Sequence, residues 1–413
     1  MREALVLLVI SYLLASCGGG GSGGGSTSSS QIQSGSFIDS PVEGLSYRSG
    51  SQSGITDSKG AFTYEAGQDV IFSIGGVTLG TVAGAQVLTP VELVSGSSSD
   101  LEVNNVVRFL LLLDTDNDGS NGISISSAVQ SVAVNWQQID FTTTDLGTAL
   151  ISIISDIASA DNRTPTLQDN VTSQAHIEST LSCLTSGIFA GGFSGDDAGT
   201  YLLWIQSQRF DPVTFGDNVP RIGVTSGLVF STVDNVVSGI VPQRGLSFDA
   251  NKSFLSGLVS SGAEFAGDLI DYRDIANGRW RNGLTSESGA FSGKRKAGDP
   301  NALYRLSGFL DVTGAVAFSA DGSGVIGLDI FSDNSVTGTM ITLRGTETPL
   351  TGTLDNNSLI TVTGNNIAFQ LSFDRDGTDP TNDVGLGDTA GFVGSWASNL
   401  ATGAVIGTSC KLN

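Results

Sequence analysis

The chain has 413 residues, of which 19 are Lys or Arg and 41 are Asp or Glu, so its formal net charge is −22. This balance excludes nucleic acid as an expected partner, because nucleic-acid recognition relies on Lys and Arg contacts to phosphate. Glycine is abundant, at 55 residues, whereas histidine occurs once. Many strand-like segments alternate with turn residues, so the sequence predicts a mainly β protein of two or three domains.

The first 16 residues have the parts of a secretory signal peptide. Arg2 supplies a positive charge, residues 4–14 form a short apolar run, and small residues precede Cys17. A helix that spans a bilayer needs roughly 20 apolar residues, and this run is about half that length. We therefore expect a cleaved signal peptide over residues 1–16 rather than a transmembrane helix.

Residues 14–17, LASC, resemble the lipobox of bacterial lipoproteins. The resemblance implies that the Cys17 sulfur carries a diacylglycerol, that the signal is cut before Cys17 and that the new amine is acylated. Gly18 rather than aspartate at the next position implies sorting to the outer membrane, on the cell surface or the periplasmic face. The alternative is an ordinary signal peptide in which Cys17 is incidental.

A glycine- and serine-rich stretch follows the cysteine, and we assign residues 17–34 to the lipidated residue and its tether. Such a composition behaves as a flexible coil, so the thirteen residues after Cys17 reach roughly 20 Å. That reach is sufficient to clear a layer of lipid headgroups.

Residues 35–99 alternate short strand candidates with turn residues. Val70–Ile74 predicts a core strand, and Gly75-Gly76 predicts a hairpin turn after it. Residues 39–47, DSPVEGLSY, and 54–64, GITDSKGAFTY, resemble carboxypeptidase-regulatory-like and prealbumin-type β-sandwich modules. The resemblance implies a small β-sandwich that acts as a spacer or binding unit and carries no catalytic set.

Residues 100–185 have a different periodicity and predict a short helical connector. The apolar run in LEVNNVVRFLLLLD, residues 101–114, suits a buried helix, and Thr144 or Asp145 is a candidate cap for a second one. Ile177, Leu181 and Leu184 recur at helical spacing and indicate a third helix.

From residue 186 to 413 strand-like segments return and predict an antiparallel β-barrel or sandwich of roughly eight or more strands. Residues 278–293 and 394–407 share a Gly-x-Trp element followed by a glycine-bounded strand, and 193–199 parallels 318–324, which indicates an internal duplication. Residues 289–295, GAFSGKR, resemble strand ends in the β-barrels of transferrin-binding-protein-like surface lipoproteins. We assign 186–413 to one barrel-like domain.

Two cysteines remain once Cys17 is lipidated. An export signal implies an oxidising compartment, so we expect Cys183 and Cys410 to form a disulfide that closes the whole C-terminal region into a loop. The alternative is a pair of buried free thiols.

Asp114, Asp116, Asp118 and Gly119 follow the first predicted helix and match positions 1, 3, 5 and 6 of an EF-hand-type calcium loop. The carboxylates of such a loop bind Ca²⁺, and its glycine permits the sharp turn. Ile125 stands at position 12, where the bidentate glutamate is expected, so the site would be weak or completed from elsewhere. The alternative is an Asp-rich turn that caps the helix and binds nothing.

Other chemistry has little support in the sequence. His176 is the single histidine and is expected at the surface or an interface, which excludes a multi-histidine zinc site. Trp204, Trp280 and Trp396 could stack on sugars or belong to the core. The sequence shows no basic patch, phosphate loop or cofactor fingerprint.

Taken together, the sequence predicts a lipid-anchored, extracytoplasmic binding or adhesion module rather than an enzyme. Its partners are expected to be the membrane, through the N-terminal lipid, and an unknown protein or glycan ligand. Two alternatives stay open, a tethered polysaccharide-active hydrolase and a structural envelope component without a soluble ligand.

Overall fold

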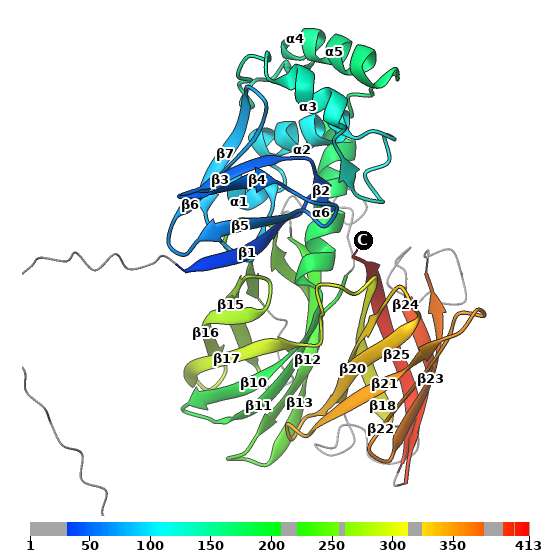
Figure 1. The fold of residues 1–413 in the computed structure, drawn as a ribbon. Coiled ribbons are helices and arrows are strands. Elements are labelled where there is room, and N and C mark those ends of the chain that lie inside the picture. The colour runs from blue at the N-terminus through cyan, green and yellow to red at the C-terminus, as the bar shows by residue number, and fades with distance from the viewer. Residues whose placement is uncertain are drawn as a thin grey trace, which may run out of the picture. The chain divides into compact units, whose positions relative to one another are not determined.

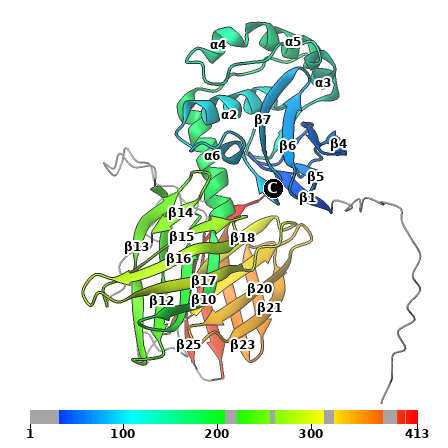
Figure 2. The ribbon, with the colours of Figure 1, turned by 90° about the vertical axis from the view of Figure 1, so that its left-hand side faces the viewer.

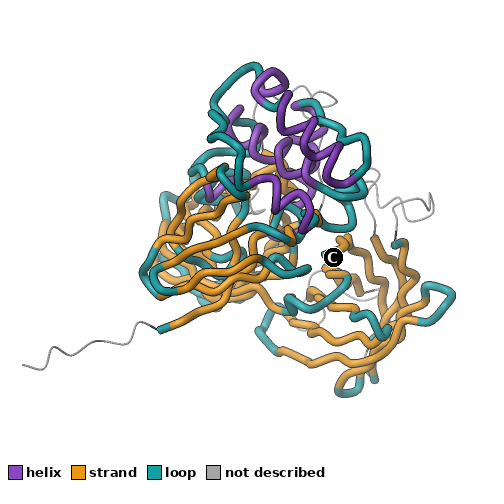
Figure 3. The backbone as a smooth tube through the Cα atoms, turned by 45° about the horizontal axis from the view of Figure 1, so that its top comes forward, coloured by secondary structure: helices purple, strands orange, loops and turns teal. Residues whose placement is uncertain are grey.

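The computed structural model of the chain describes residues 31–207, 221–255, 261–312, 324–375, 391–399 and 401–412. The expected signal peptide, Cys17 and most of the tether lie outside these residues. The fold is mainly β, as predicted, with its helices confined to one part of the chain (Figures 1 and 3). In the described residues, no helix is of sufficient length and apolarity to cross a membrane.

The N-terminal strands form two small sheets, in the orders β5-β1-β8 and β4-β3-β6-β7. Phe37, Phe62 and Phe72 fill the space inside this module, with ring centroids 4.7 and 5.1 Å from the Phe72 ring. Val70–Ile74 lies in strand β6, and the glycine hairpin follows it, as predicted. The strands are β1 Ile32–Phe37, β2 Val42–Glu43, β3 Ser46–Ser49, β4 Gln52–Ile55, β5 Ala61–Glu65, β6 Asp69–Ile74, β7 Val77–Ala83 and β8 Val87–Leu88.

Six helices and one short strand follow. The apolar run predicted to be a buried helix forms α2, in which Leu110–Leu113 are all buried. Asp145 caps α4, because its side chain accepts the Thr148 N–H at 3.2 Å. The elements are α1 Pro90–Leu93, α2 Leu101–Leu113, β9 Ile123–Ser124, α3 Ser127–Ala133, α4 Leu146–Ala149, α5 Ile151–Asp161 and α6 Asn170–Thr185.

The C-terminal region contains two closed antiparallel barrels of eight strands each, where the sequence indicated one barrel-like domain (Figure 2). In each barrel every strand pairs with the next, and the first strand pairs with the last. The first barrel comprises β10 Gly187–Gly195, β11 Gly199–Ile205, β12 Arg221–Ser231, β13 Val236–Ser247, β14 Ser253–Leu255, β15 Ala263–Ile270, β16 Asp274–Asn282 and β17 Ser288–Lys296. The second comprises β18 Tyr304–Val312, β19 Gly324–Ile330, β20 Ser335–Thr342, β21 Glu347–Leu354, β22 Leu359–Gly364, β23 Ile367–Asp374, β24 Gly391–Ser398 and β25 Thr402–Lys411.

Both barrels close on a pair of facing glycines. Gly191 lies opposite Gly293 on the first and last strands of one barrel, and Gly308 lies opposite Gly407 in the other. A Cβ atom on Gly191 would lie 1.9 Å from the Ser292 carbonyl oxygen, so only glycine permits this approach of the strands. The matching positions support the internal duplication, although residues 318–323 of the repeat lie outside the described residues.

Side chains fill both barrels. Aromatic rings of Phe193, Tyr201, Phe265 and Phe291 pack together in the first, with centroids 5.2 to 6.1 Å apart. The second holds its own apolar cluster, and alternate residues on its strands β21–β23 are buried and exposed. The outer faces of the barrels meet at Trp204, whose Nε1 donates to Ser307 Oγ at 2.9 Å.

Candidate functional site

The N-terminal module, the end of α6 and the ends of several barrel strands line a cavity of about 400 Å³ that is open to solvent. A volume in this range suits a small organic ligand. Four cationic side chains and one carboxylate, Asp271, are among its lining residues. The lining residues are Ser34, Gly35, Ser36, Ile38, Lys59, Ala61, Gln86, Val87, Leu184, Asp271, Tyr272, Arg273, Arg295, Gly298, Pro300, Asn301, Arg305 and Leu412.

Two arginines of this cavity hold the C-terminus of helix α6. Arg295 Nη1 donates to the Leu184 carbonyl at 2.7 Å, and Arg305 Nη1 donates to the Cys183 carbonyl at 3.2 Å. The last carbonyls of a helix lack partners within it, and a cation there also interacts favourably with the helix dipole. Arg295 comes from the first barrel and Arg305 from the second, so both barrels are tied to α6 at the cavity wall.

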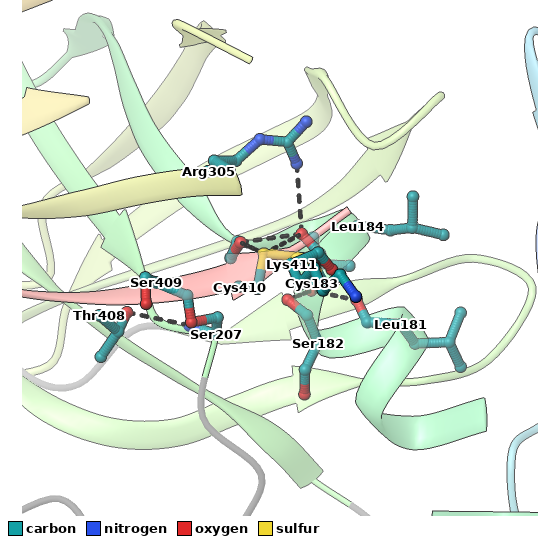
Figure 4. Close-up of a disulfide and its surroundings, with 12 residues drawn as sticks. Leu181, Ser182, Cys183, Leu184, Ser207, Arg305, Thr408, Ser409, Cys410 and Lys411 are labelled. Atoms are coloured by element: carbon teal, nitrogen blue, oxygen red, sulfur yellow. Dashed lines mark hydrogen bonds between the residues drawn. A yellow bond between two sulfur atoms is a disulfide. The ribbon is translucent and has the colours of Figure 1, made fainter. Parts of the chain in front are cut away.

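The predicted disulfide is present and lies next to these contacts (Figure 4). It joins Cys183 in α6 to Cys410 in the last strand, with Cα atoms 5.6 Å apart. Ser207, which follows β11, adds a hydrogen bond from its hydroxyl to the Ser409 carbonyl at 2.9 Å. The C-terminal strand is therefore fixed to α6 beside the cavity.

The Asp-rich loop follows α2 as predicted, and its carboxylates are engaged within the loop. Asp116 Oδ1 accepts the Asp118 N–H at 2.9 Å, and Asp118 Oδ1 accepts the Ser120 N–H at 3.1 Å. Asp114 is 1% exposed, and its Oδ1 accepts the Ser124 N–H at 3.0 Å while Oδ2 is buried without a hydrogen bond. Burial, reinforced by Asp116, raises the pKa of Asp114 to about 6.

No cluster of three or more His, Cys, Asp or Glu side chains is arranged to hold a metal ion within the described chain. One carboxylate oxygen of Asp114 nevertheless lacks a partner. The loop thus has the residue spacing of a calcium loop. The carboxylates of Asp116 and Asp118, however, accept hydrogen bonds from neighbouring backbone and side-chain donors.

His176 lies at an interface, where α6 contacts the N-terminal module. Its Nε2 is 3.3 Å from Oδ1 of Asp39, a carboxylate that is fully buried. Burial lowers the pKa of His176, but the charge and hydrogen bonding of Asp39, with a contribution from Asp114, outweigh it, so the pKa is raised. A protonated His176 therefore stabilises this contact.

This raised pKa predicts a pH dependence of stability. The stabilisation is fully present below the unfolded-state pKa of about 6.5 and is lost as pH rises through the raised folded-state pKa. We expect the melting temperature of the wild-type protein to be higher than that of His176→Gln, with the largest difference at pH 6. The difference should become smaller as the pH rises to about 8.5. Melting curves of both proteins across this range test it, and a difference that is constant with pH contradicts it.

The three tryptophans that could stack on sugars are all buried. Trp280 and Trp396 belong to the apolar clusters of the first and second barrels, with exposed fractions of 4% and 5%. Trp204 is 4% exposed and packs edge-on against Phe309 between the barrels. They act as core and interface residues.

The cluster of Arg273, Arg295 and Arg305 was missed by sequence reasoning, which found no basic patch. These residues lie in the β15–β16 turn, near the end of β17 and at the start of β18, so no short window of sequence contains them. The run Lys294-Arg295-Lys296 was the available signal, in a chain with only 19 basic residues.

Comparisons with known proteins identify no relative: no family model, curated protein or solved structure matches the chain.

Proposed function

We propose that the chain is a lipid-anchored extracytoplasmic lipoprotein that binds a ligand in the arginine-lined cavity. The observation that carries this proposal is the concentration of cationic side chains in one cavity of a strongly acidic protein. Lys59, Arg273, Arg295 and Arg305 line it, out of 19 basic residues in the whole chain. Arg295 and Arg305 are buried and share one carboxylate, Asp329. Buried charge that is incompletely balanced is costly, so its retention favours a functional role.

The filled barrels support a binding site outside the barrel interiors. Aromatic side chains occupy the inside of the first barrel, and the second has an equally apolar centre. The barrels therefore act as rigid bodies that position loops and strand ends, and the cavity lies where such strand ends converge. We therefore propose a binding role for the cavity rather than a catalytic one.

A variant that fills the cavity tests the proposal. We expect Ser36→Trp to place an indole in the cavity, because Ser36 lines it from strand β1. A small-molecule extract of the cell envelope should raise the melting temperature of the wild-type protein but not of Ser36→Trp. Thr351→Trp is the matched control, since Thr351 is exposed on the outer face of the second barrel. An equal response of all three proteins to every extract contradicts the cavity as the binding site.

The membrane anchor rests on the lipobox resemblance and the glycine-rich tether. Acyl chains bind a bilayer through about 0.8 kcal/mol per buried methylene, so a multiply acylated cysteine is a firm anchor. We expect wild-type protein to incorporate labelled palmitate and to fractionate with membranes. Cys17→Ala should lose both properties, and a membrane-bound, unlabelled wild-type protein would contradict lipidation.

We further propose that the Asp-rich loop binds calcium weakly, through Asp114, Asp116 and Asp118. The buried, unpartnered Oδ2 of Asp114 supports this, because a cation would satisfy it. We expect calcium at a hundred times its Kd to stabilise the wild-type protein by about 2.7 kcal/mol relative to chelator.

The matched variants for this prediction are Asp114→Asn, which should lose the calcium response, and Asp140→Asn, which should keep it. Asp140 makes a similar exposed turn contact, to the Thr142 N–H at 2.9 Å, away from the loop. Thermal melts with and without calcium decide the question. An unchanged wild-type midpoint leaves the loop as a turn that ends α2.

A further inference from the structure

We propose that the arginine-lined cavity recognises a phosphate or sulfate group carried by a small organic molecule. This inference rests on the proposed function, since it names the ligand class of the same cavity. Two features of the cavity support it, the balance of its charges and the donors that its cations leave without partners.

The floor of the cavity contains two arginines that are almost completely buried. Arg295 is 9% exposed and Arg305 is 6% exposed, and each donates one hydrogen bond to a carbonyl at the end of α6. A guanidinium has five N–H donors. The Nε atoms of both residues are closed off from solvent and have no hydrogen-bond acceptor, so a ligand in the cavity would meet the terminal nitrogens. The α6 contacts therefore satisfy only part of the donor capacity of this pair.

The side chains of Arg295 and Arg305 both lie close to the turn at Gly298. This glycine has φ +109°, and a Cβ atom there would lie 3.0 Å from Arg295 Nε and 3.3 Å from Arg305 Nε. Any larger residue would press on both cations, and it would also be strained in this backbone conformation. Glycine thus keeps the space beside the pair free.

A buried carboxylate, Asp329, acts on both arginines, and one of its two oxygens is bound by the backbone. Asp329 Oδ2 accepts the backbone N–H groups of Gly298 and Asp299, at 2.7 and 2.9 Å. No ion pair joins Arg295 or Arg305 to a carboxylate in the part of the chain that the structure describes. Burial and the neighbouring cations lower the pKa of Arg295, and burial lowers that of Arg305 to about 10, with Asp329 opposing both shifts. Both groups stay charged at neutral pH.

Two further cations are accessible to solvent. Lys59 and Arg273 line the same cavity and are exposed, and Lys59 Nζ contacts the Asn301 side-chain oxygen at 2.9 Å. A ligand can therefore meet these residues first and the buried arginines afterwards. The arrangement combines an entrance with a partly dehydrated floor, where charge-assisted hydrogen bonds are strong.

Neighbouring cavities differ in the partners of their cations. A cavity of about 290 Å³ beside strand β15 contains Lys252, but its Nζ lies 2.7 Å from Glu92 Oε1. A smaller one on the first barrel contains Arg281, which pairs with Glu264 at 2.9 Å. Lys252 and Arg281 thus have carboxylate partners, whereas Arg279, which also lines the smaller cavity, has no ion pair within the described chain. The arginine-lined cavity has four cations and Asp271 as its one lining carboxylate.

The chemistry of the cations selects the ligand class. Arginine forks match the oxygens of phosphate and sulfate. The four cations exceed the two carboxylates near them, Asp271 and Asp329, by two positive charges, which suits a group with two negative charges. The cavity, at about 400 Å³, is larger than a bare oxyanion needs, and Ile38, Val87 and Leu184 supply apolar wall. A phosphorylated or sulfated small molecule fills this space better than the inorganic ion.

Calorimetric titration of the full-length protein, extracted in a neutral detergent, tests the inference. The probes are glucose 6-phosphate, inorganic phosphate and sulfate, with glucose as the neutral control and ionic strength held constant with chloride. We expect glucose 6-phosphate to bind more tightly than inorganic phosphate, and glucose not to bind. Lys59→Gln and Arg273→Gln should each weaken binding by about tenfold, equivalent to 1.4 kcal/mol. These exposed positions are chosen because changes at Arg295 and Arg305 would also release α6.

Arg281→Gln is the matched control, because it removes an exposed cation from the barrel wall and should leave the affinity unchanged. Loss of affinity in all three variants indicates a general charge effect and overturns the proposal, as does failure of every anionic probe to bind. Binding of glucose as tight as that of glucose 6-phosphate, abolished by Ser36→Trp, also overturns the anion assignment while leaving the cavity as a ligand site. Absence of any ligand effect that depends on Ser36 would contradict the proposed function itself.

Discussion

We expect removal of the Cys183–Cys410 disulfide to lower the free energy of unfolding by about 5 kcal/mol. The bond closes a loop with a sequence separation of 227 residues, which includes both barrels. In the chain-entropy model, a crosslink restricts the unfolded chain more as the loop lengthens. The disulfide also holds the last strand against α6. The terminal carbonyls of this helix accept hydrogen bonds from Arg295 and Arg305.

Chemical denaturation of Cys183→Ser, Cys410→Ser and the double variant measures this effect. If the crosslink is responsible, the three variants lose the same stability, and the wild-type protein with reductant behaves as they do. Losses that add in the double variant would instead assign the effect to separate packing of each side chain.

The second large effect is expected for Trp280→Ala, which should cost about 3–5 kcal/mol of stability. Trp280 is 4% exposed inside the first barrel, its ring packs edge-on against Phe193, and its Nε1 donates to the Ser194 carbonyl at 3.0 Å. Replacement by alanine leaves a cavity and removes the hydrogen bond of the indole. Urea denaturation followed by circular dichroism measures the loss.

Two control variants separate packing from other roles of this tryptophan. Trp280→Phe keeps much of the ring volume and should lose about 1–3 kcal/mol, mainly through the missing hydrogen bond. Leu284→Ala removes a side chain that is 81% exposed and should change stability by less than about 0.5 kcal/mol. If Trp280→Ala kept full stability and lost binding to a polysaccharide, the sugar-stacking interpretation would replace the core assignment.

Local features of the fold could be predicted from the sequence because they follow from short-range rules. The strand at Val70–Ile74, the glycine hairpin after it and the Asp145 cap each depend on a few neighbouring residues. The pairing of Cys183 with Cys410 followed from an export signal and the count of cysteines. The mainly β class followed from composition and the frequency of turn residues.

The division into two barrels could not be predicted in the same way. Strands β11 and β19 are buried on both faces, because one face lies inside a barrel and the other meets the second barrel. Their sequences, GTYLLWI and GVIGLDI, therefore lack the alternation of a half-exposed strand. Loops of different length between equivalent strands further obscured the duplication.

The cavity depended on long-range placement and had no local signature. Lys59 belongs to the N-terminal module, Arg273 to a turn of the first barrel and Arg305 to the first strand of the second. Each is an isolated basic residue in a sequence with 41 acidic ones. Only the folded chain shows that they share a cavity. The buried pair of His176 with Asp39 is another contact between distant segments.

Native mass spectrometry of the protein extracted from membranes tests the central claim, a lipid-anchored protein that holds a ligand in the arginine-lined cavity. The mass measured under denaturing conditions should correspond to a chain that begins at Cys17 and carries three acyl chains on that residue. The native mass should show an additional non-covalent, anionic adduct that is present in Thr351→Trp and absent from Ser36→Trp. An unlipidated chain would contradict the anchor. The absence of an adduct, or its retention by Ser36→Trp, would contradict the cavity as the binding site.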